Sequence, residues 1–225
     1  MLPLITELAQ FILSIPTRLL LIICADFKAE GLEILDNIDT SKGIILASNH
    51  VSQLDSIAIG CALPPLSKFA PIYYVALAKK EYFRFPIGKY IYGGAIFRLL
   101  GAYAIQRGVK DYALALANHI PLLKQGKTIS IFPEGRVQHG GKLGEARGGM
   151  TYMSHVSGAP IVPTAIIGLD DVRWWEFLMC KRKVIIRFGN PIYFSEIDEP
   201  SLPPEIRYHK AAQKVMLKVG ELIHT

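Results

Sequence analysis

The 225-residue sequence predicts an α/β fold, a single domain with a central, mostly parallel sheet flanked by helices and preceded by an apolar N-terminal helix. Short apolar runs of β-type alternate with stretches of helical spacing from Phe27 onward. Hydrophobic residues make up 51% of the chain and charged residues 20%, which excludes a disordered or fibrous protein. No internal repeat or linker divides the chain, whose length suffices for one full core.

The first 26 residues form an apolar segment that we expect to be helical and to lie in the membrane interface, with the domain proper at residues 27–225. A signal peptide would begin with a basic region, whereas the first charge here is Glu7. A membrane-spanning helix is disfavoured because Glu7 and Arg18 interrupt the apolar run, and Pro16 is expected to break the helix. A helix that packs on the domain and completes its core is the open alternative.

The elements of the domain follow from its apolar spacing. The continuous apolar run Gly43–Ser48 predicts a buried strand, and a helix is expected over Ser52–Leu63. Further strands are expected at Tyr73–Leu77, Ala102–Ile105, Thr128–Phe132, Pro160–Ile166 and Val184–Phe188. Further helices are expected at Val109–Gln125, Gly148–Ser157 and Leu202–Ile223.

The formal net charge of +6 indicates an anionic partner, which is a nucleic acid, a phosphorylated small molecule or a membrane surface. Residues 68–111 contain eight Lys or Arg and two acidic residues, so this segment holds the whole net charge. Aromatic residues in the same segment would suit nucleic-acid stacking. In an apolar context such aromatics more often belong to the core, so we expect no nucleic-acid partner.

Several common catalytic and binding motifs are missing from the sequence. It has no G-x-S-x-G elbow, no P-loop, no G-x-G-x-x-G after a strand and no H-E-x-x-H. Its three cysteines, Cys24, Cys61 and Cys180, lie far apart in apolar stretches, without metal-ligand spacing. We therefore expect ordinary thiols in a reducing compartment, and no metal site.

His50 and Asp55 form the first candidate site, between the strand that ends at Ser48 and the helix that follows. Ligands of open α/β sheets bind at the C-terminal ends of strands. With His50 in the turn and Asp55 in the first helical turn, Asp55 can accept a hydrogen bond from one imidazole nitrogen and leave the other free as a base. The alternative is structural, because Ser52 and Asp55 also fit a capping box.

Two further motifs stand at predicted strand ends. The turn Phe132–Arg136 displays Glu134, which can accept hydrogen bonds from hydroxyl groups, and Arg136, which can bind phosphate through two donors. Gly135 permits the unusual backbone angle of such a turn. The segment Gly101–Arg107 is a strand that ends in arginine. Taken alone, these motifs also fit a surface turn and a solvated strand end.

Together with the apolar stretch Ile161–Pro163, these blocks resemble the lysophospholipid/glycerophospholipid acyltransferase family, specifically its 1-acylglycerol-3-phosphate acyltransferases. The family's motifs are N-H-x4-D, G-x-x-x-[IV]-x-R, F-P-E-G-[ST]-R and a stretch ending in V-P, and matches occur here in that order. The resemblance spans about residues 43–168. Lys79 fits a lysine that the family has upstream of its second motif.

The resemblance implies an O-acyltransferase of phospholipid biosynthesis. Such an enzyme moves a fatty acyl group from acyl-CoA or acyl carrier protein to the free hydroxyl of 1-acylglycerol-3-phosphate, giving phosphatidic acid. It implies that His50 is the general base, that Asp55 orients it, and that no acyl-enzyme forms. The substrate-binding residues that it implies are Lys79, Arg107, Glu134, Gly135 and Arg136.

The same resemblance implies the surroundings of the reaction. No cofactor is expected beyond the acyl-CoA or acyl carrier protein co-substrate. The expected partners are a lysophospholipid acceptor, the acyl donor and the membrane surface. We expect a peripheral membrane protein on the cytoplasmic face.

One departure from the family pattern leaves the acceptor open. Arg136 directly follows Gly135, where the family usually has Thr or Ser before the arginine. The same FPEGR motif occurs in acyltransferases of other lysophospholipids, so an acceptor such as lysophosphatidylethanolamine is an alternative. Outside enzymes, the alternative is a non-catalytic peripheral membrane protein that binds anionic lipid, against which the intact His50 and Asp55 argue.

Overall fold

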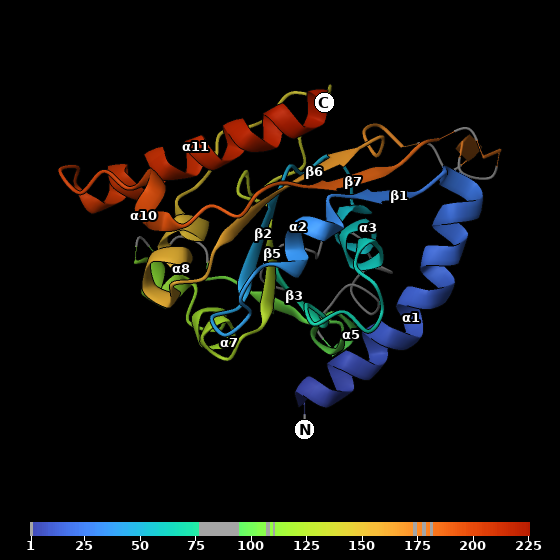
Figure 1. Ribbon diagram of the computed structural model, residues 1–225, viewed down its shortest axis with the longest axis horizontal. Coiled ribbons are helices and arrows are strands. Elements are labelled where there is room, and N and C mark those ends of the chain that lie inside the picture. The colour runs from blue at the N-terminus through green and yellow to red at the C-terminus, as the bar shows by residue number, and fades with distance from the viewer. Residues whose placement is uncertain are drawn as a thin grey trace.

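The computed structural model describes residues 2–76, 95–106, 109, 111–172, 175–176, 179–180 and 182–225. In these residues a seven-stranded sheet of order β1-β7-β6-β2-β5-β3-β4 forms the middle layer, with helices on both of its faces (Figure 1). The strands are β1 Lys28–Glu30, β2 Ile44–Ser48, β3 Ile72–Ala76, β4 Ala102–Ala104, β5 Thr128–Ile131, β6 Ile161–Ile167 and β7 Ile185–Phe188.

The sheet is mostly parallel, as the alternation of elements predicts. Every neighbouring pair is parallel except β6 and β7, which run antiparallel. β2 lies between β6 and β5 and all five of its residues are buried, which explains its continuous apolar sequence. The structure therefore confirms the predicted fold class.

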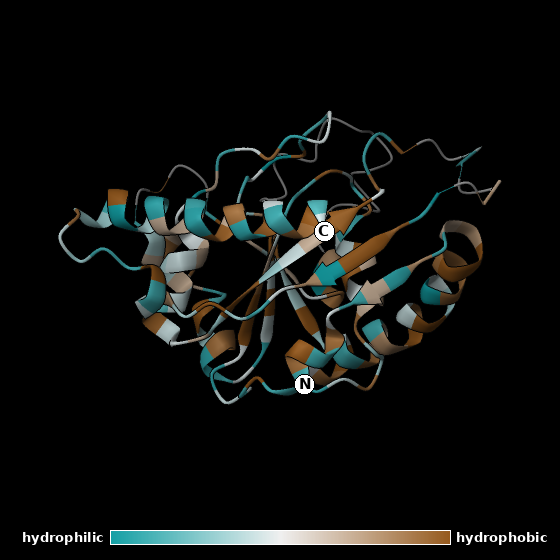
Figure 2. Ribbon diagram, turned by 45° about the horizontal axis from the view of Figure 1, so that its top comes forward, coloured by the Kyte–Doolittle hydropathy of each residue, from teal (hydrophilic) through white to brown (hydrophobic). Residues whose placement is uncertain are grey.

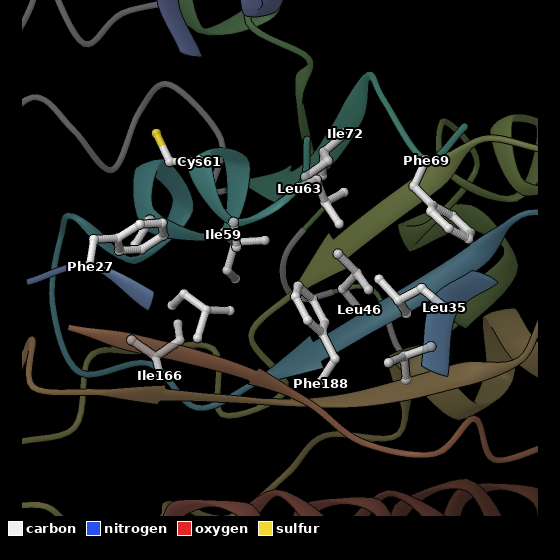
Figure 3. Packing of buried hydrophobic residues seen from close by; sticks show 14 of the residues in the cluster. Phe27, Leu35, Leu46, Ile59, Cys61, Leu63, Phe69, Ile72, Ile166 and Phe188 are labelled. Atoms are coloured by element: carbon white, nitrogen blue, oxygen red, sulfur yellow. The ribbon is translucent and has the colours of Figure 1, made fainter. Parts of the chain in front are cut away.

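The helices cover both faces of this sheet. They are α1 Leu2–Ala25, α2 Leu32–Asp36, α3 Asp55–Ala62, α5 Ala95–Leu99, α6 Tyr112–Ala115, α7 Ile120–Lys124, α8 Gly149–Ser157, α10 Phe194–Ile197 and α11 Pro204–His224. Alternate residues of β2 point to opposite faces, so Ile44 and Leu46 pack in one core cluster while Ile45 and Ala47 pack in another. Figure 3 shows Leu46 of β2 and Ile59 of α3 within the first of these clusters.

Helix α1 is continuous, so the prediction that Pro16 breaks it is wrong. Pro16 lies on an exposed side of the helix, where the carbonyl that loses its N–H partner can be solvated. Bonds from the helix to the domain hold it on both sides of the proline, through Gln10 and Arg18. Residues Leu4–Ala25 are long and apolar enough to cross a membrane, a test of length and composition that core helices and signal sequences also pass.

The predicted single helix over Val109–Gln125 is also wrong. Its described part contains two short helices, α6 and α7, joined by turns at residues 116–119. Pro121 stands in the first turn of α7, where its missing N–H is tolerated, whereas in the interior of one long helix the same proline would remove a hydrogen bond. Four short elements of three to five residues each were not predicted from the sequence: β1, α2, α5 and α10.

Candidate active site

The candidate site forms at the edge where the parallel strands β2 and β5 end. The two strands are neighbours, with Ala47 of β2 opposite Ile131 of β5, so the residues that follow each strand emerge side by side. His50 follows β2, and Glu134 and Gly135 follow β5. This is the edge at which ligands of open α/β sheets bind.

His50 and Asp55 are in direct contact. His50 Nδ1 lies 2.8 Å from Asp55 Oδ2, and the side chains are 19% and 0% exposed respectively. A carboxylate only accepts, so Nδ1–H donates and the tautomer leaves Nε2 with a free lone pair. No described residue bonds to Nε2. The arrangement gives a base whose reactive nitrogen is available to a substrate proton.

The backbone around Asp55 fixes the carboxylate in this position. Oδ2 also accepts from the N–H groups of Val51, at 2.7 Å, and Ser52, at 2.9 Å. The Ser52 hydroxyl accepts from Leu54 N–H at 3.1 Å. Helix α3 begins at Asp55 with Leu54 at its N-cap, so the predicted capping box with Ser52 at the N-cap is wrong. Asp55 instead holds the turn before the helix through the Val51 and Ser52 N–H groups, with the same oxygen that contacts His50.

The imidazole of His50 also has a fixed plane. It stacks on Phe132 with ring centroids 4.1 Å apart and an interplanar angle of 14°. Phe132 directly follows β5, so the first and third sequence motifs meet through these two rings. The stacking and the Asp55 bond together restrict both the position and the rotation of the base.

Asn49 has a role that the sequence analysis did not assign. Its side-chain amide donates to the carbonyl of Ile166 at 2.9 Å and accepts from the N–H of the same residue at 2.8 Å. Asn49 is buried, and it continues the β2–β6 ladder one step beyond the last paired residue, Ser48. It thereby anchors the backbone from which His50 projects. An asparagine after a strand gives no sequence signal for this bridge, because Ile166 is 117 residues away.

Glu134 is buried beside the histidine, with 3% of its surface exposed. Burial raises its pKa from 4.5 to about 7, and the backbone of Gly144, the charge of His50 and the amide of Gln138 oppose that rise. No described group stands in good hydrogen-bonding geometry to either carboxylate oxygen. A buried carboxylate of this kind is suited to bind a ligand that brings its own donors.

Gly135 forms the turn that presents Glu134, and Arg147 lies against it. Gly135 has φ of +66°, and its N–H donates to the carbonyl of Phe132 at 3.0 Å. A Cβ on Gly135 would lie 3.3 Å from Nε of Arg147, and Arg147 N–H donates to the carbonyl of Pro133 at 2.9 Å. The guanidinium therefore lies at the Glu-Gly turn. Arg147 was not predicted from the sequence, because a single arginine 13 positions after Glu134 belongs to no recognised motif.

The remaining predicted residues are placed as follows. Arg136 is exposed next to Gly135. Lys79 and Arg107 lie outside the described residues. Val162 and Pro163 are buried in β6, opposite Leu46 and Ala47 of β2, so the fourth motif pairs with the strand that leads to His50. Among the residues that the structure describes, no group of three His, Cys, Asp or Glu side chains could hold a metal ion.

Comparisons with known proteins agree with this geometry. A family model described as Acyltransferase matches residues 31–167, which include the His50–Asp55 pair and the Glu134 turn. A protein of Mycoplasma genitalium named "Probable 1-acyl-sn-glycerol-3-phosphate acyltransferase" is 28% identical over 185 residues, which are 76% of this chain and 66% of that protein. The chain thus spans just under two thirds of the length of that relative.

A second relative and a solved structure match over longer shares. The 1-acyl-sn-glycerol-3-phosphate acyltransferase of Bacillus subtilis is 27% identical over 188 residues, 83% of this chain and 84% of its own length. The crystal structure of the 1-acyl-sn-glycerophosphate (LPA) acyltransferase PlsC from Thermotoga maritima matches with a TM-score of 0.58 and 25% identity, over 89% of this chain and 73% of that one. The likeness to the solved structure thus extends over most of this chain.

Proposed function

The chain belongs to the acyltransferase family, and we propose that it transfers a fatty acyl group from an acyl thioester to the free hydroxyl of 1-acylglycerol-3-phosphate, giving phosphatidic acid. The observation that carries this proposal is the contact between His50 Nδ1 and Asp55 Oδ2, which leaves Nε2 available at the edge beside Glu134. The printed names of the relatives from Mycoplasma genitalium and Bacillus subtilis support the choice of acceptor.

His50 acts as the general base of the proposed reaction. Its Nε2 accepts the proton of the acceptor hydroxyl while that oxygen attacks the thioester carbonyl carbon. The carbon–sulfur bond then breaks, the ester remains on the glycerol, and His50 returns the proton to the departing thiolate. Asp55 stabilises the imidazolium that forms between these steps, and no acyl-enzyme is needed. Base catalysis of this kind contributes about 10²–10⁴-fold to the rate.

Cationic side chains bind the phosphate of the acceptor. Lys79, Arg107 and Arg136 have this role by their places in the motifs, and Arg147 joins them because its guanidinium lies against the Gly135 turn. Glu134 binds glycerol hydroxyl groups, for which its unbonded carboxylate oxygens are suited. Because these groups fix the acceptor beside His50, positioning supplies much of the remaining rate enhancement.

The acyl donor is acyl-CoA or an acyl carrier protein, and no further cofactor or metal takes part. Both donors are acidic, which suits a chain with a net charge of +6. The protein is peripheral to the cytoplasmic face of a membrane, where its lipid acceptor resides. The exposed apolar side chains of α1 support this location.

The test is product identification with the purified full-length chain. Wild type is incubated with lysophosphatidic acid and either palmitoyl-CoA or palmitoyl acyl carrier protein, beside the His50→Ala variant. Phosphatidic acid from wild type and none from the variant supports the proposal. Absence of acyl transfer with both donors overturns it.

A second acceptor is considered because Arg136 directly follows Gly135, which departs from the usual spacing of the phosphate-binding arginine. The same assay includes lysophosphatidylethanolamine in competition with lysophosphatidic acid. A higher kcat/KM for lysophosphatidylethanolamine would move the assignment to that acceptor, while the His50 mechanism would stand.

A further inference from the structure

Gln138 lies at the point where the His50 turn and the Glu134 turn meet, although it belongs to neither motif. Its backbone N–H donates to the carbonyl of His50 at 2.7 Å. It follows Glu134 by four positions, and its side chain is half-buried. The residue is therefore fixed beside both the base and the buried carboxylate.

The side-chain amide of Gln138 acts on the Glu134 carboxylate. Together with the backbone of Gly144 and of His50, it lowers the pKa of Glu134 against the larger rise that burial causes. Among the described residues, neither carboxylate oxygen has a partner in good hydrogen-bonding geometry. The amide thus favours the ionised carboxylate through its dipole, and leaves the oxygen lone pairs to an incoming hydroxyl group.

Gly144 packs directly against this amide. A Cβ at Gly144 would lie 2.4 Å from Nε2 and 2.6 Å from Cδ of Gln138. The backbone of Gly144 is not in the left-handed region, so any residue could adopt its conformation. The close approach of the Gln138 amide is what calls for a glycine at this position.

Helix α11 supports the segment that carries Gly144. Gln213 Nε2 donates to the carbonyl of Ala146 at 3.2 Å, and a Cβ at Gly220 would lie 3.1 Å from Cδ1 of Leu143. Figure 2 shows α11, which ends at the C mark, with alternating teal and brown turns, as expected for a helix that packs one side on the domain. The helix lies outside residues 31–167, which the family model matches. A part of the chain beyond that match therefore supports the Gln138 contact.

Few charged groups surround the carboxylate. From the first motif, His50 faces Glu134 and its charge lowers the pKa of the carboxyl. On the turn of Glu134 itself, the guanidinium of Arg147 lies against Gly135. From the segment on α11, the backbone of Gly144 faces it. With a pKa of about 7, Glu134 is only partly ionised near neutral pH, so one neutral donor beside it has a measurable effect.

We propose that Gln138 is a positioning residue for the acyl transfer, which holds the Glu134 carboxylate ionised and directed toward the acceptor hydroxyl beside His50. The proposal rests on the proposed function, because that function makes Glu134 a ligand of the acceptor. Gln138 touches no reacting atom and acts through Glu134.

The first test compares the acceptor KM of Gln138→Leu and wild type at pH 7 and pH 9. Leucine keeps the backbone N–H and the bulk but removes the amide. At pH 7 the KM should rise about 3–10-fold, as for the loss of one hydrogen bond, with little change in kcat. At pH 9 Glu134 is ionised in both proteins, so the two KM values should converge. The acceptor phosphate and His50 titrate in both proteins, which is why the ratio of the two KM values is compared.

An equal KM at pH 7, or a rise of the same size at both pH values, overturns the proposal, since a merely structural role does not depend on the ionisation of Glu134. Gln138→Glu should raise the KM at pH 7 further than Gln138→Leu, because two adjacent carboxyl groups resist ionising together. A smaller rise than in Gln138→Leu overturns the proposal too. The matched control is Gln125→Leu, exposed before β5 at the opposite edge of the sheet, which should behave like wild type.

The second test displaces the amide without changing residue 138. Gly144→Ala should raise the KM at pH 7, because its Cβ forces the Gln138 amide to move. In a Gln138→Ala background the same substitution should have little effect, since no amide is left to displace. The control is Gly149→Ala, whose Cβ would meet Leu116 Cδ1 at an ordinary 3.5 Å. An equal effect of Gly144→Ala in both backgrounds overturns the proposal.

The third test needs no activity. The Glu134 carboxyl carbon is titrated by ¹³C NMR in protein labelled at glutamate side chains, and its signal is assigned by its loss in Glu134→Gln. The midpoint is expected at about 7 in wild type and about one pH unit higher in Gln138→Leu. If wild type transfers no acyl group while the midpoint shifts, the proposed function fails and the contact between Gln138 and Glu134 stands. An unchanged midpoint overturns the positioning role whatever the activity.

Discussion

The catalytic edge and the outward face of α1 depart from ordinary surface chemistry in opposite ways. At the catalytic edge polar side chains are buried, with Asn49 and Glu134 each 3% exposed and Asp55 fully buried. On α1 ten large apolar side chains face away from the domain and are 45–70% exposed. The backbone satisfies Asn49 and one oxygen of Asp55. Among the described residues Glu134 has no partner in good hydrogen-bonding geometry, and the α1 leucines are not covered, so the first indicates a ligand and the second an apolar medium.

The largest expected effect is on the base at the catalytic edge. His50→Ala should lower kcat by about 10²–10⁴-fold, because the acceptor hydroxyl loses its proton acceptor. The melting temperature should stay close to that of wild type, since Asp55 keeps the N–H groups of Val51 and Ser52. The measurement is steady-state kinetics together with thermal unfolding.

The control for this variant is His224→Ala, in the last turn of α11, where the side chain is exposed. It should leave kcat unchanged. A folded His50→Ala protein with wild-type turnover would remove the base from the mechanism and would leave Asp55 only its bonds to the N–H groups of Val51 and Ser52.

The two arginines beside Gly135 are expected to differ in their effect on acceptor binding. Arg147→Ala should raise the acceptor KM about 10–100-fold with little change in kcat, which corresponds to the loss of a charge-assisted phosphate contact worth roughly 1.5–3 kcal/mol. Both arginines are exposed, but the guanidinium of Arg147 lies against the Gly135 turn, so Arg136→Ala should have the smaller effect. Steady-state kinetics at varied acceptor concentration measures the KM of both variants. A larger rise of KM in Arg136→Ala than in Arg147→Ala would show that Arg136 makes the main phosphate contact.

Much of the catalytic edge could be predicted because its residues lie close together in the sequence. His50 and Asp55 are five positions apart, and the strands Ile44–Ser48 and Thr128–Ile131 begin and end within a residue or two of the expected bounds. Ile44–Ala47 is continuously apolar and Thr128–Phe132 alternates polar with apolar residues, and both patterns favour a short strand. The short elements β1 and α2 escaped prediction because three to five residues carry too little periodicity to recognise.

Long-range contacts account for the rest of what the sequence did not reveal. Asn49 meets Ile166 across 117 positions, and Arg147 reaches Gly135 only because a loop returns to Pro133. Helix α1 is the opposite case. Its apolar residues were evident in the sequence, but the side that faces the domain depends on acceptors at Ile72 and Cys61, which only the fold brings to it. The sequence shows which residues of α1 are apolar, but only the fold shows which of them face the domain and which face away from it.

Glu134 should make stability depend on pH. Its pKa is about 7 when folded, against an ordinary value of 4.5, so the folded state binds the proton more tightly. The stabilisation by the bound proton is therefore fully present below pH 4.5 and is lost as the pH rises through 7. Between pH 5 and 8 the free energy of unfolding of wild type should fall by on the order of 1–3 kcal/mol more than that of Glu134→Gln, in which this titration is absent. Urea unfolding at several pH values in this range measures the free energy of unfolding of both proteins. If it changes with pH equally in both, Glu134 titrates at its ordinary pKa.

The smallest expected effect tests how firmly α1 is held to the domain. Gln10→Leu removes two hydrogen bonds to backbone carbonyls and leaves Ile72 N–H without its acceptor, at a cost of roughly 1–2 kcal/mol. For a chain of this size the melting temperature should fall by about 2–6 °C. Gln53→Leu, at an exposed position before α3, is the matched control and should change it little. Hydrogen exchange gives the local reading, because the Ile72 amide should lose protection in Gln10→Leu while the centre of β2 keeps it. If that amide stays protected and the melting temperature is unchanged, α1 is held by its apolar contacts with α3 instead.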